Sequence, residues 1–138
     1  MKPSAVITLV VVLLAALGFF FYERSQRTAP IEDTLGTASA PQAGVPEGAH
    51  VITLTEDGFV PDELTINARE TVAWRTETGE LFWPASNLHP SHLIYPEFDP
   101  KQPIPPDQSW SFTFTKTGEW KYHDHLAPYF TGVITVIE

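Results

Sequence analysis

Two short histidine clusters are the residues of this sequence that could do metal chemistry. Residues 89–92 read His-Pro-Ser-His and residues 123–125 read His-Asp-His, so two clusters hold four of the five histidines. Imidazole nitrogens suit Cu(II) and, less selectively, zinc or nickel. The sequence predicts a metal site for copper, with zinc or no metal as alternatives, and the candidate ligands are His89, His92, His123 and His125.

The composition excludes several other kinds of site. The chain has 138 residues and no cysteine, and its single methionine is Met1. Disulfides, zinc fingers, iron–sulfur clusters and thiolate nucleophiles are therefore excluded. A formal net charge of -9 argues against nucleic-acid binding, which needs a basic surface. No serine lies in a nucleophile-elbow pattern, so we do not expect a hydrolase, although an open metal site could activate water or dioxygen.

The N-terminal half of the chain changes composition twice. Residues 4–22 carry no charge and are long enough for a helix to cross a bilayer, so we expect residues 1–22 to be a transmembrane anchor or signal-anchor. A cleaved signal peptide is the lesser alternative, because its apolar region would be shorter. Residues 23–47 are rich in proline, alanine, glycine and serine and are expected to form a flexible linker. Residues 48–138 are expected to be the folded domain.

The elements expected to position the histidines are short β-strands. Apolar residues alternate with polar ones in several short segments separated by turn residues, which predicts a β-sandwich or barrel. The expected strands lie within residues 50–55, 64–66, 72–74, 110–115, 120–122 and 133–137. Alternation along the fifth strand places His123 and His125 on one side and Asp124 on the other. Residues 77–108 form a long proline-rich segment, and so long a loop usually has a function.

The order of these segments resembles cupredoxin domains across residues 50–137. The segments that carry the resemblance are Gly-Phe-Val-Pro at 58–61, Leu-Thr-Ile at 64–66, Thr-Val-Ala-Trp at 71–74, Ser-Trp-Ser-Phe-Thr-Phe at 109–114, Gly-Glu-Trp-Lys-Tyr-His at 118–123 and Gly-Val-Ile-Thr-Val at 132–136. The resemblance implies an all-β Greek-key sandwich that works outside the cytoplasm. It therefore implies a single-pass protein of the cytoplasmic membrane with its domain on the periplasmic or extracellular side.

The departure from the cupredoxin pattern changes the expected chemistry. In a blue-copper member the last loop supplies a cysteine, a histidine and often a methionine; those positions are Asp124, the vicinity of Ala127 and the vicinity of Phe130. Because blue-copper colour and fast electron transfer depend on copper–thiolate bonding, we exclude that chemistry. Two geometries remain open. Either the four histidines converge on one nitrogen-rich site, or His92 and Asp124 form a weakly binding remnant of the ordinary site.

Other residues near the clusters have less certain roles. Residues 82–84, Phe-Trp-Pro, could cover the site or cap the sandwich. Glu97 and Asp99 are expected to be solvated, although either could supply a metal ligand. His50 has no nearby partner in the sequence and is expected to be a surface or hydrogen-bonded residue.

Three functions are compatible with these observations. The first is a membrane-anchored, extracytoplasmic copper-binding protein that handles or delivers copper. The second is a metal-free sandwich that binds a protein or envelope partner. The third is a type 2 copper redox enzyme or electron carrier, which is disfavoured because all-nitrogen copper reorganises between the geometries of its two oxidation states.

Overall fold

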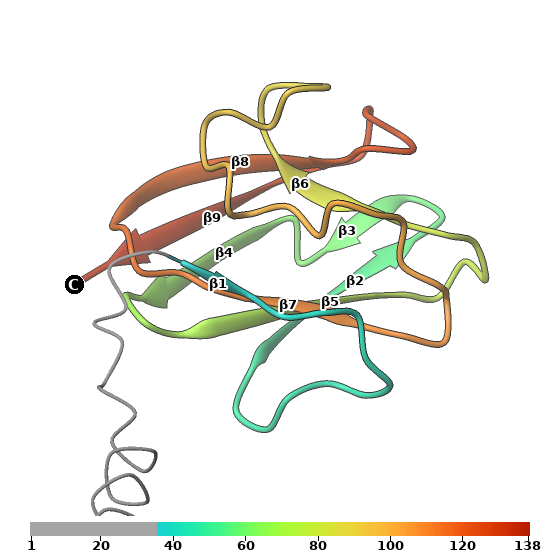
Figure 1. Ribbon diagram of the computed structural model, residues 1–138, viewed down its shortest axis with the longest axis horizontal. Coiled ribbons are helices and arrows are strands. Elements are labelled where there is room, and N and C mark those ends of the chain that lie inside the picture. Colours follow the sequence, from blue (N-terminus) through green and yellow to red (C-terminus); the bar gives the residue numbers. More distant parts are fainter. Residues whose placement is uncertain (1–35) are drawn as a thin grey trace, which may run out of the picture. The chain divides into compact units, whose positions relative to one another are not determined.

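A computed structural model describes residues 36–138, which fold into two packed β-sheets without a helix (Figure 1). The all-β sandwich predicted from the sequence is thereby confirmed for these residues. Its strands are β1 (Thr37–Ala38), β2 (His50–Thr55), β3 (Gly58–Val60), β4 (Glu63–Asn67), β5 (Thr71–Thr76), β6 (Pro84–Ser86), β7 (Trp110–Thr113), β8 (Gly118–Asp124) and β9 (Thr131–Ile137).

The two sheets differ in the strands that they contribute to the histidine end of the molecule. One sheet has the order β1-β7-β5-β2-β3 and the other the order β4-β9-β8-β6. Most neighbours are antiparallel, while β2 pairs with β5 and β4 pairs with β9 in parallel. Strand β8 lies between β9 and the short edge strand β6, and its register pairs Ala85 with His123. The second histidine cluster therefore starts at the end of a central strand.

Aromatic side chains fill the space between the sheets. Trp74, Trp110 and Tyr122 come from strands and are fully buried, as alternation predicts. Phe98 also lies in this core, with its ring centroid 5.8 Å from that of Trp110 and the two rings parallel within 1°. The long segment between β5 and β7 is thus part of the core, to which it contributes Phe82, Tyr95, Phe98 and Ile104.

Three short strands were not predicted from the sequence. Strands β3 and β6 have only three residues each, too few to show a period of two. Strand β1 lies inside the expected linker and pairs with β7, Thr37 opposite Thr113. Its sequence resembles a linker because an exposed edge strand of two residues needs no apolar side chain. The described part of residues 23–47 thus adds an edge to the first sheet.

The predicted membrane anchor, residues 1–22, and the first part of the predicted linker lie outside the described residues. Within residues 36–138, no helix has the length and apolarity needed to cross a membrane.

Candidate metal centre

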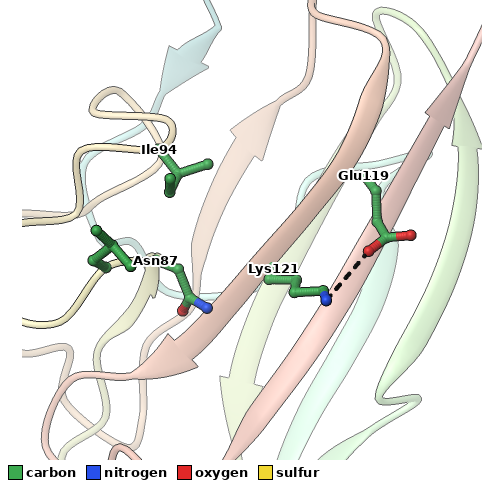
Figure 2. Close-up of a pocket in the computed structure, with 5 residues that line it drawn as sticks. Asn87, Ile94, Glu119 and Lys121 are labelled. Atoms are coloured by element: carbon green, nitrogen blue, oxygen red, sulfur yellow. Dashed lines mark ion pairs between the residues drawn. The ribbon is translucent and has the colours of Figure 1, made fainter.

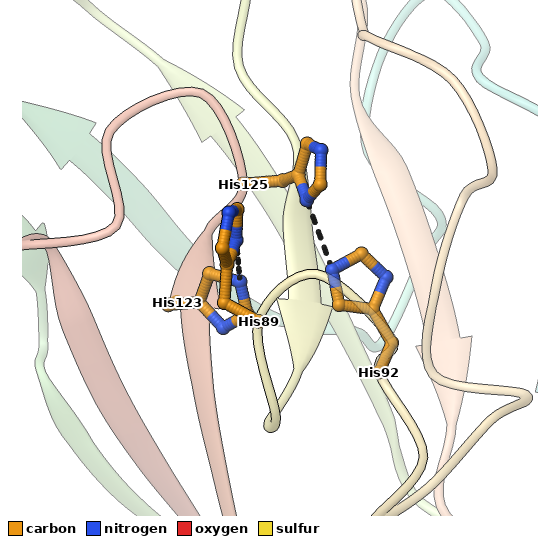
Figure 3. Close-up of side chains that lie close together, drawn as sticks. All are labelled: His89, His92, His123 and His125. Carbon is orange, nitrogen blue, oxygen red and sulfur yellow. Dashed lines mark hydrogen bonds between the residues drawn. The ribbon is translucent and has the colours of Figure 1, made fainter.

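All four predicted histidines converge at one end of the sandwich (Figure 3). Their candidate ligand nitrogens lie within 4.8 Å of one another, although the two clusters are more than 30 residues apart in sequence. The loop after β6 carries His89 and His92; the end of β8 carries His123, and His125 follows it. The four side chains converge as the first of the two expected geometries requires.

The facing nitrogens of the four rings form two close pairs. His89 Nδ1 lies 3.1 Å from His123 Nε2, and His92 Nε2 lies 3.0 Å from His125 Nδ1. Each pair therefore joins one loop histidine to one histidine from the end of β8, as Figure 3 shows. A single proton can be shared in each pair, so the rings are hydrogen-bonded without a metal.

His92 is held from behind by a buried carboxylate. Its Nδ1 donates to Asp99 Oδ2 over 2.6 Å, and both side chains are about 5% exposed or less. This bond fixes the tautomer that leaves the lone pair of Nε2 facing the cluster. The backbone of His92 has a φ of 54°, in the left-handed region that few residues other than glycine, asparagine, aspartate and histidine adopt.

His123 has a comparable support. Its Nδ1 lies 2.9 Å from Asn87 Oδ1, which can only accept, so Nδ1 carries the proton and Nε2 faces the cluster with its lone pair. The ring is 3% exposed. Asn87 was not predicted as a site residue, because nothing in the sequence shows that the residue two positions before His89 folds back to His123.

Trp83 connects the two loops that carry the histidines. Its indole Nε1 donates to Asp99 Oδ1 over 2.8 Å, and its carbonyl accepts the N–H of His125 over 2.7 Å. Its ring centroid lies 4.4 Å from that of His125. Trp83 therefore lies against the site, whereas the fully buried Phe82 is part of the hydrophobic core.

Asp124, which occupies the cysteine position of the resemblance, has a structural role. Its Oδ1 accepts the backbone N–H groups of Trp83 and Leu126, each over 3.0 Å. The carboxylate thus fastens the turn that follows β8 instead of joining the group formed by the four histidines. Burial raises its pKa, and these backbone donors oppose that shift.

Burial and mutual proximity lower the pKa values of His123 and His125. Desolvation, followed by the charges of His92, His89 and His125, lowers the pKa of His123 to about 4. Desolvation and the same neighbours also lower the pKa of His125. For Asp99, burial alone would raise the pKa, but hydrogen bonds from Lys101, His92 and Trp83 outweigh it and lower the pKa to about 2. A histidine must be neutral to coordinate a metal ion, and a lowered pKa favours that neutral form.

The donor set and spacing fit one four-coordinate metal ion. With metal–nitrogen bonds of about 2.0 Å, neighbouring nitrogens lie about 2.8 Å apart in a planar site and about 3.3 Å apart in a tetrahedral one. The observed pairs at 3.0 and 3.1 Å lie between these values. The widest separations, which reach at most 4.8 Å, would shorten to about 4.0 Å across a planar site or to about 3.3 Å in a tetrahedral one when a metal binds. The cluster can therefore hold a metal.

The remaining candidates from the sequence lie elsewhere. Asp99 is buried, so the expectation that it is solvated was wrong, and it supports a ligand rather than joining the ligand set. Glu97 forms an ion pair with Lys116 at 3.3 Å. His50 pairs with Glu70 at 3.2 Å, as expected for a partly exposed, hydrogen-bonded residue.

A pocket of about 260 Å³ adjoins the histidine loop beside β8 (Figure 2). Glu119 and Lys121, which line it, form an ion pair at 3.6 Å. Asn87 lines the same pocket and also holds His123. The other lining residues are Leu88 and Ile94.

Comparison with known proteins identifies the fold. No family model and no curated protein matches this sequence. Among solved structures, a reduced tryptophan-to-tyrosine mutant of amicyanin matches with a TM-score of 0.64 at 21% identity, covering 74% of this chain and 98% of amicyanin. A reduced Cu(I) proline-to-glycine mutant of amicyanin matches with a TM-score of 0.61 at 23% identity, over the same shares of the two chains. The chain thus has the cupredoxin fold, in an amicyanin-like form that contains no cysteine.

Proposed function

We propose that this protein binds one Cu(II) ion through His89, His92, His123 and His125 and serves in copper handling or delivery. The observation that carries the proposal is the convergence of four imidazole nitrogens, none farther than 4.8 Å from another, with two of the rings fixed from behind. Among divalent first-row ions, Cu(II) binds most tightly to such nitrogen sites. The similarity to amicyanin, whose matched structures include a Cu(I) form, supports copper over other ions.

The donor set argues against electron transfer as the main function. Neither a thiolate nor a thioether is available, because the chain has no cysteine and its only methionine is Met1. Cu(I) favours such soft ligands, whereas nitrogen ligands favour Cu(II). A site of this kind holds the oxidised ion preferentially, which suits storage or transfer of Cu(II).

The location is proposed on separate grounds. We propose that residues 1–22 anchor the protein in the cytoplasmic membrane and that the domain lies on the extracytoplasmic side. The uncharged stretch from residue 4 to residue 22 supports the anchor. Membrane fractionation, followed by protease treatment of intact and permeabilised cells, tests both parts of this proposal. Digestion of the domain only after permeabilisation of the inner membrane would contradict it.

The experiment that tests copper binding is a Cu(II) titration of the full-length chain in detergent, followed by EPR and visible absorption. We expect one equivalent to bind with a nitrogen-rich type 2 spectrum and without an intense thiolate band. The double variant His123→Ala/His125→Ala should lose this binding. The matched control is His50→Ala, which removes a histidine outside the cluster and should bind like the wild type. Binding no tighter than that of the double variant would refute the proposal, and a Zn(II) titration in parallel would show whether zinc is preferred.

A further inference from the structure

The four histidines differ in how firmly each ring is held. His92 and His123 are each 3% exposed. Each also has its second ring nitrogen bonded to a fixed acceptor, Asp99 or Asn87. His89 is exposed and His125 is partly exposed. Within residues 36–138, the rings of His89 and His125 have no hydrogen bond other than the one each makes to a buried partner across the cluster.

The backbone and ring contacts rank the two less buried histidines. The N–H of His125 donates to the carbonyl of Trp83, and the two rings lie 4.4 Å apart between centroids. His89 is exposed in the loop after β6, and among the described residues its ring packs only near those of the other three histidines (Figure 3). The order of restraint is therefore His123 and His92 first, His125 next and His89 last.

We propose that His89 is the exchange ligand of the centre, through which copper is taken up from and passed to a small chelator or a partner that offers nitrogen or oxygen donors. This inference rests on the proposed copper binding. In the exchange, the bond from the incoming donor forms while the bond to His89 Nδ1 breaks. The lone pair stays on the imidazole, and the oxidation state of copper does not change. His125 is replaced next, and His92 and His123 are replaced last.

The cost of detaching each ring supports this order. An exposed ring that detaches regains rotamer freedom and meets water, so its lone pair is solvated. A buried ring that detaches without moving leaves a lone pair without a partner, which carries a desolvation cost. Moving His92 or His123 out of the cluster would instead break the bond to Asp99 or Asn87. Exchange therefore begins at His89.

The test measures transfer of Cu(II) from the full-length chain to EDTA by stopped-flow absorption, together with the affinity from chelator competition. His89→Ala should still bind one equivalent, with an affinity lower than that of the wild type but higher than that of His123→Ala. Its transfer to EDTA should be faster than that of the wild type, because one coordination position is already open. His123→Ala and His92→Asn should lose stoichiometric binding. Asparagine tolerates the left-handed backbone of position 92, which guards against misfolding.

Leu88→Ala is the matched control, since it changes an exposed neighbour of His89 in the same loop. It should leave both affinity and transfer rate unchanged. The inference is overturned if His89→Ala loses as much affinity as His123→Ala, or if its transfer to EDTA is no faster than that of the wild type. Failure of the wild type to bind one equivalent would instead overturn the proposed function.

A second measurement needs no variant. Nitrogen-detected NMR of the metal-free chain should show slowly exchanging Nδ1–H protons for His92 and His123 and averaged imidazole signals for His89. If the ring N–H protons of His89 and His123 exchanged with water equally slowly, the inference would be contradicted. This result would not depend on any effect of a mutation on folding.

Discussion

The sandwich core and the inner part of the histidine end, with His92, His123 and Asp99, are both buried, but different forces fix their side chains. In the core, Phe98 lies among aromatic rings, 5.3 Å from Phe112 between centroids, and packing alone sets its place. At the histidine end, the next residue, Asp99, accepts hydrogen bonds from His92, Trp83 and Lys101. Packing tolerates small shifts, whereas hydrogen bonds define which nitrogen faces the cluster. Changes in the core should therefore alter stability, and changes at the histidine end should alter metal affinity.

Phe98→Ala should produce the largest effect on stability. Removing a fully buried phenylalanine costs about 3–5 kcal/mol, because apolar contacts are lost and a cavity remains. Urea denaturation of the metal-free chain measures this loss. The control is Leu93→Ala in the same loop, where a side chain 67% exposed should change stability by less than about 0.5 kcal/mol. Equal losses in the two variants would show that the loop does not belong to the core.

Asp99→Asn should act mainly on metal affinity. The variant keeps the shape of the side chain but removes the charge that orients His92, and loss of such a partner lowers metal affinity about 10- to 100-fold. Chelator competition with Cu(II) measures the change. Glu97→Gln is the control, because this nearby carboxylate pairs with Lys116 and should leave affinity unchanged. An Asp99→Asn protein that binds like the wild type would assign Asp99 to stability alone.

The sequence predicted the strands and much of the core, but it did not predict the residues that support the histidines. Alternation identified strands such as residues 50–55 and placed Trp110 in the core, because a one-faced strand leaves a period of two. The convergence of the four histidines was one of the two geometries that the cupredoxin resemblance left open. The supports Asp99 and Asn87 could not be predicted. They lie in an irregular loop whose path depends on contacts with Trp83 and His123 across 16 and 36 residues.

The metal-free protein should lose stability in two steps as the pH falls. The pKa of His123 is lowered from 6.5 to about 4, so the unfolded chain takes up a proton first and stability declines between these values. The pKa of Asp99 is lowered from 3.8 to about 2, so the stability that it contributes above pH 3.8 is lost between about 3.8 and 2. Urea denaturation across pH 7 to 2 measures both steps.

His123→Gln is the matched variant for this pH profile. Glutamine does not titrate in this range, so the decline between pH 6.5 and 4 should become shallower. The decline below pH 3.8 should remain, since Asp99 is unchanged. A wild-type profile that is flat between pH 7 and 4 would contradict the assignment to His123.

Removal of β1 should have the smallest effect. The experiment compares a fragment of residues 48–138 with a fragment of residues 36–138. The shorter fragment lacks the two backbone hydrogen bonds between Gln42 and Ser109, at 2.8 and 2.9 Å, and the hydrogen bond between Ser39 and Ser111. Each hydrogen bond contributes about 1 kcal/mol net, but ordering each residue costs a similar amount, so the shorter fragment should lose only about 1 kcal/mol. Copper affinity should not change, because β1 belongs to the other sheet from β6 and β8. A loss of copper affinity in the shorter fragment would mean that the histidine end depends on the edge of the opposite sheet. Stability and metal affinity would then not be controlled by separate parts of the molecule.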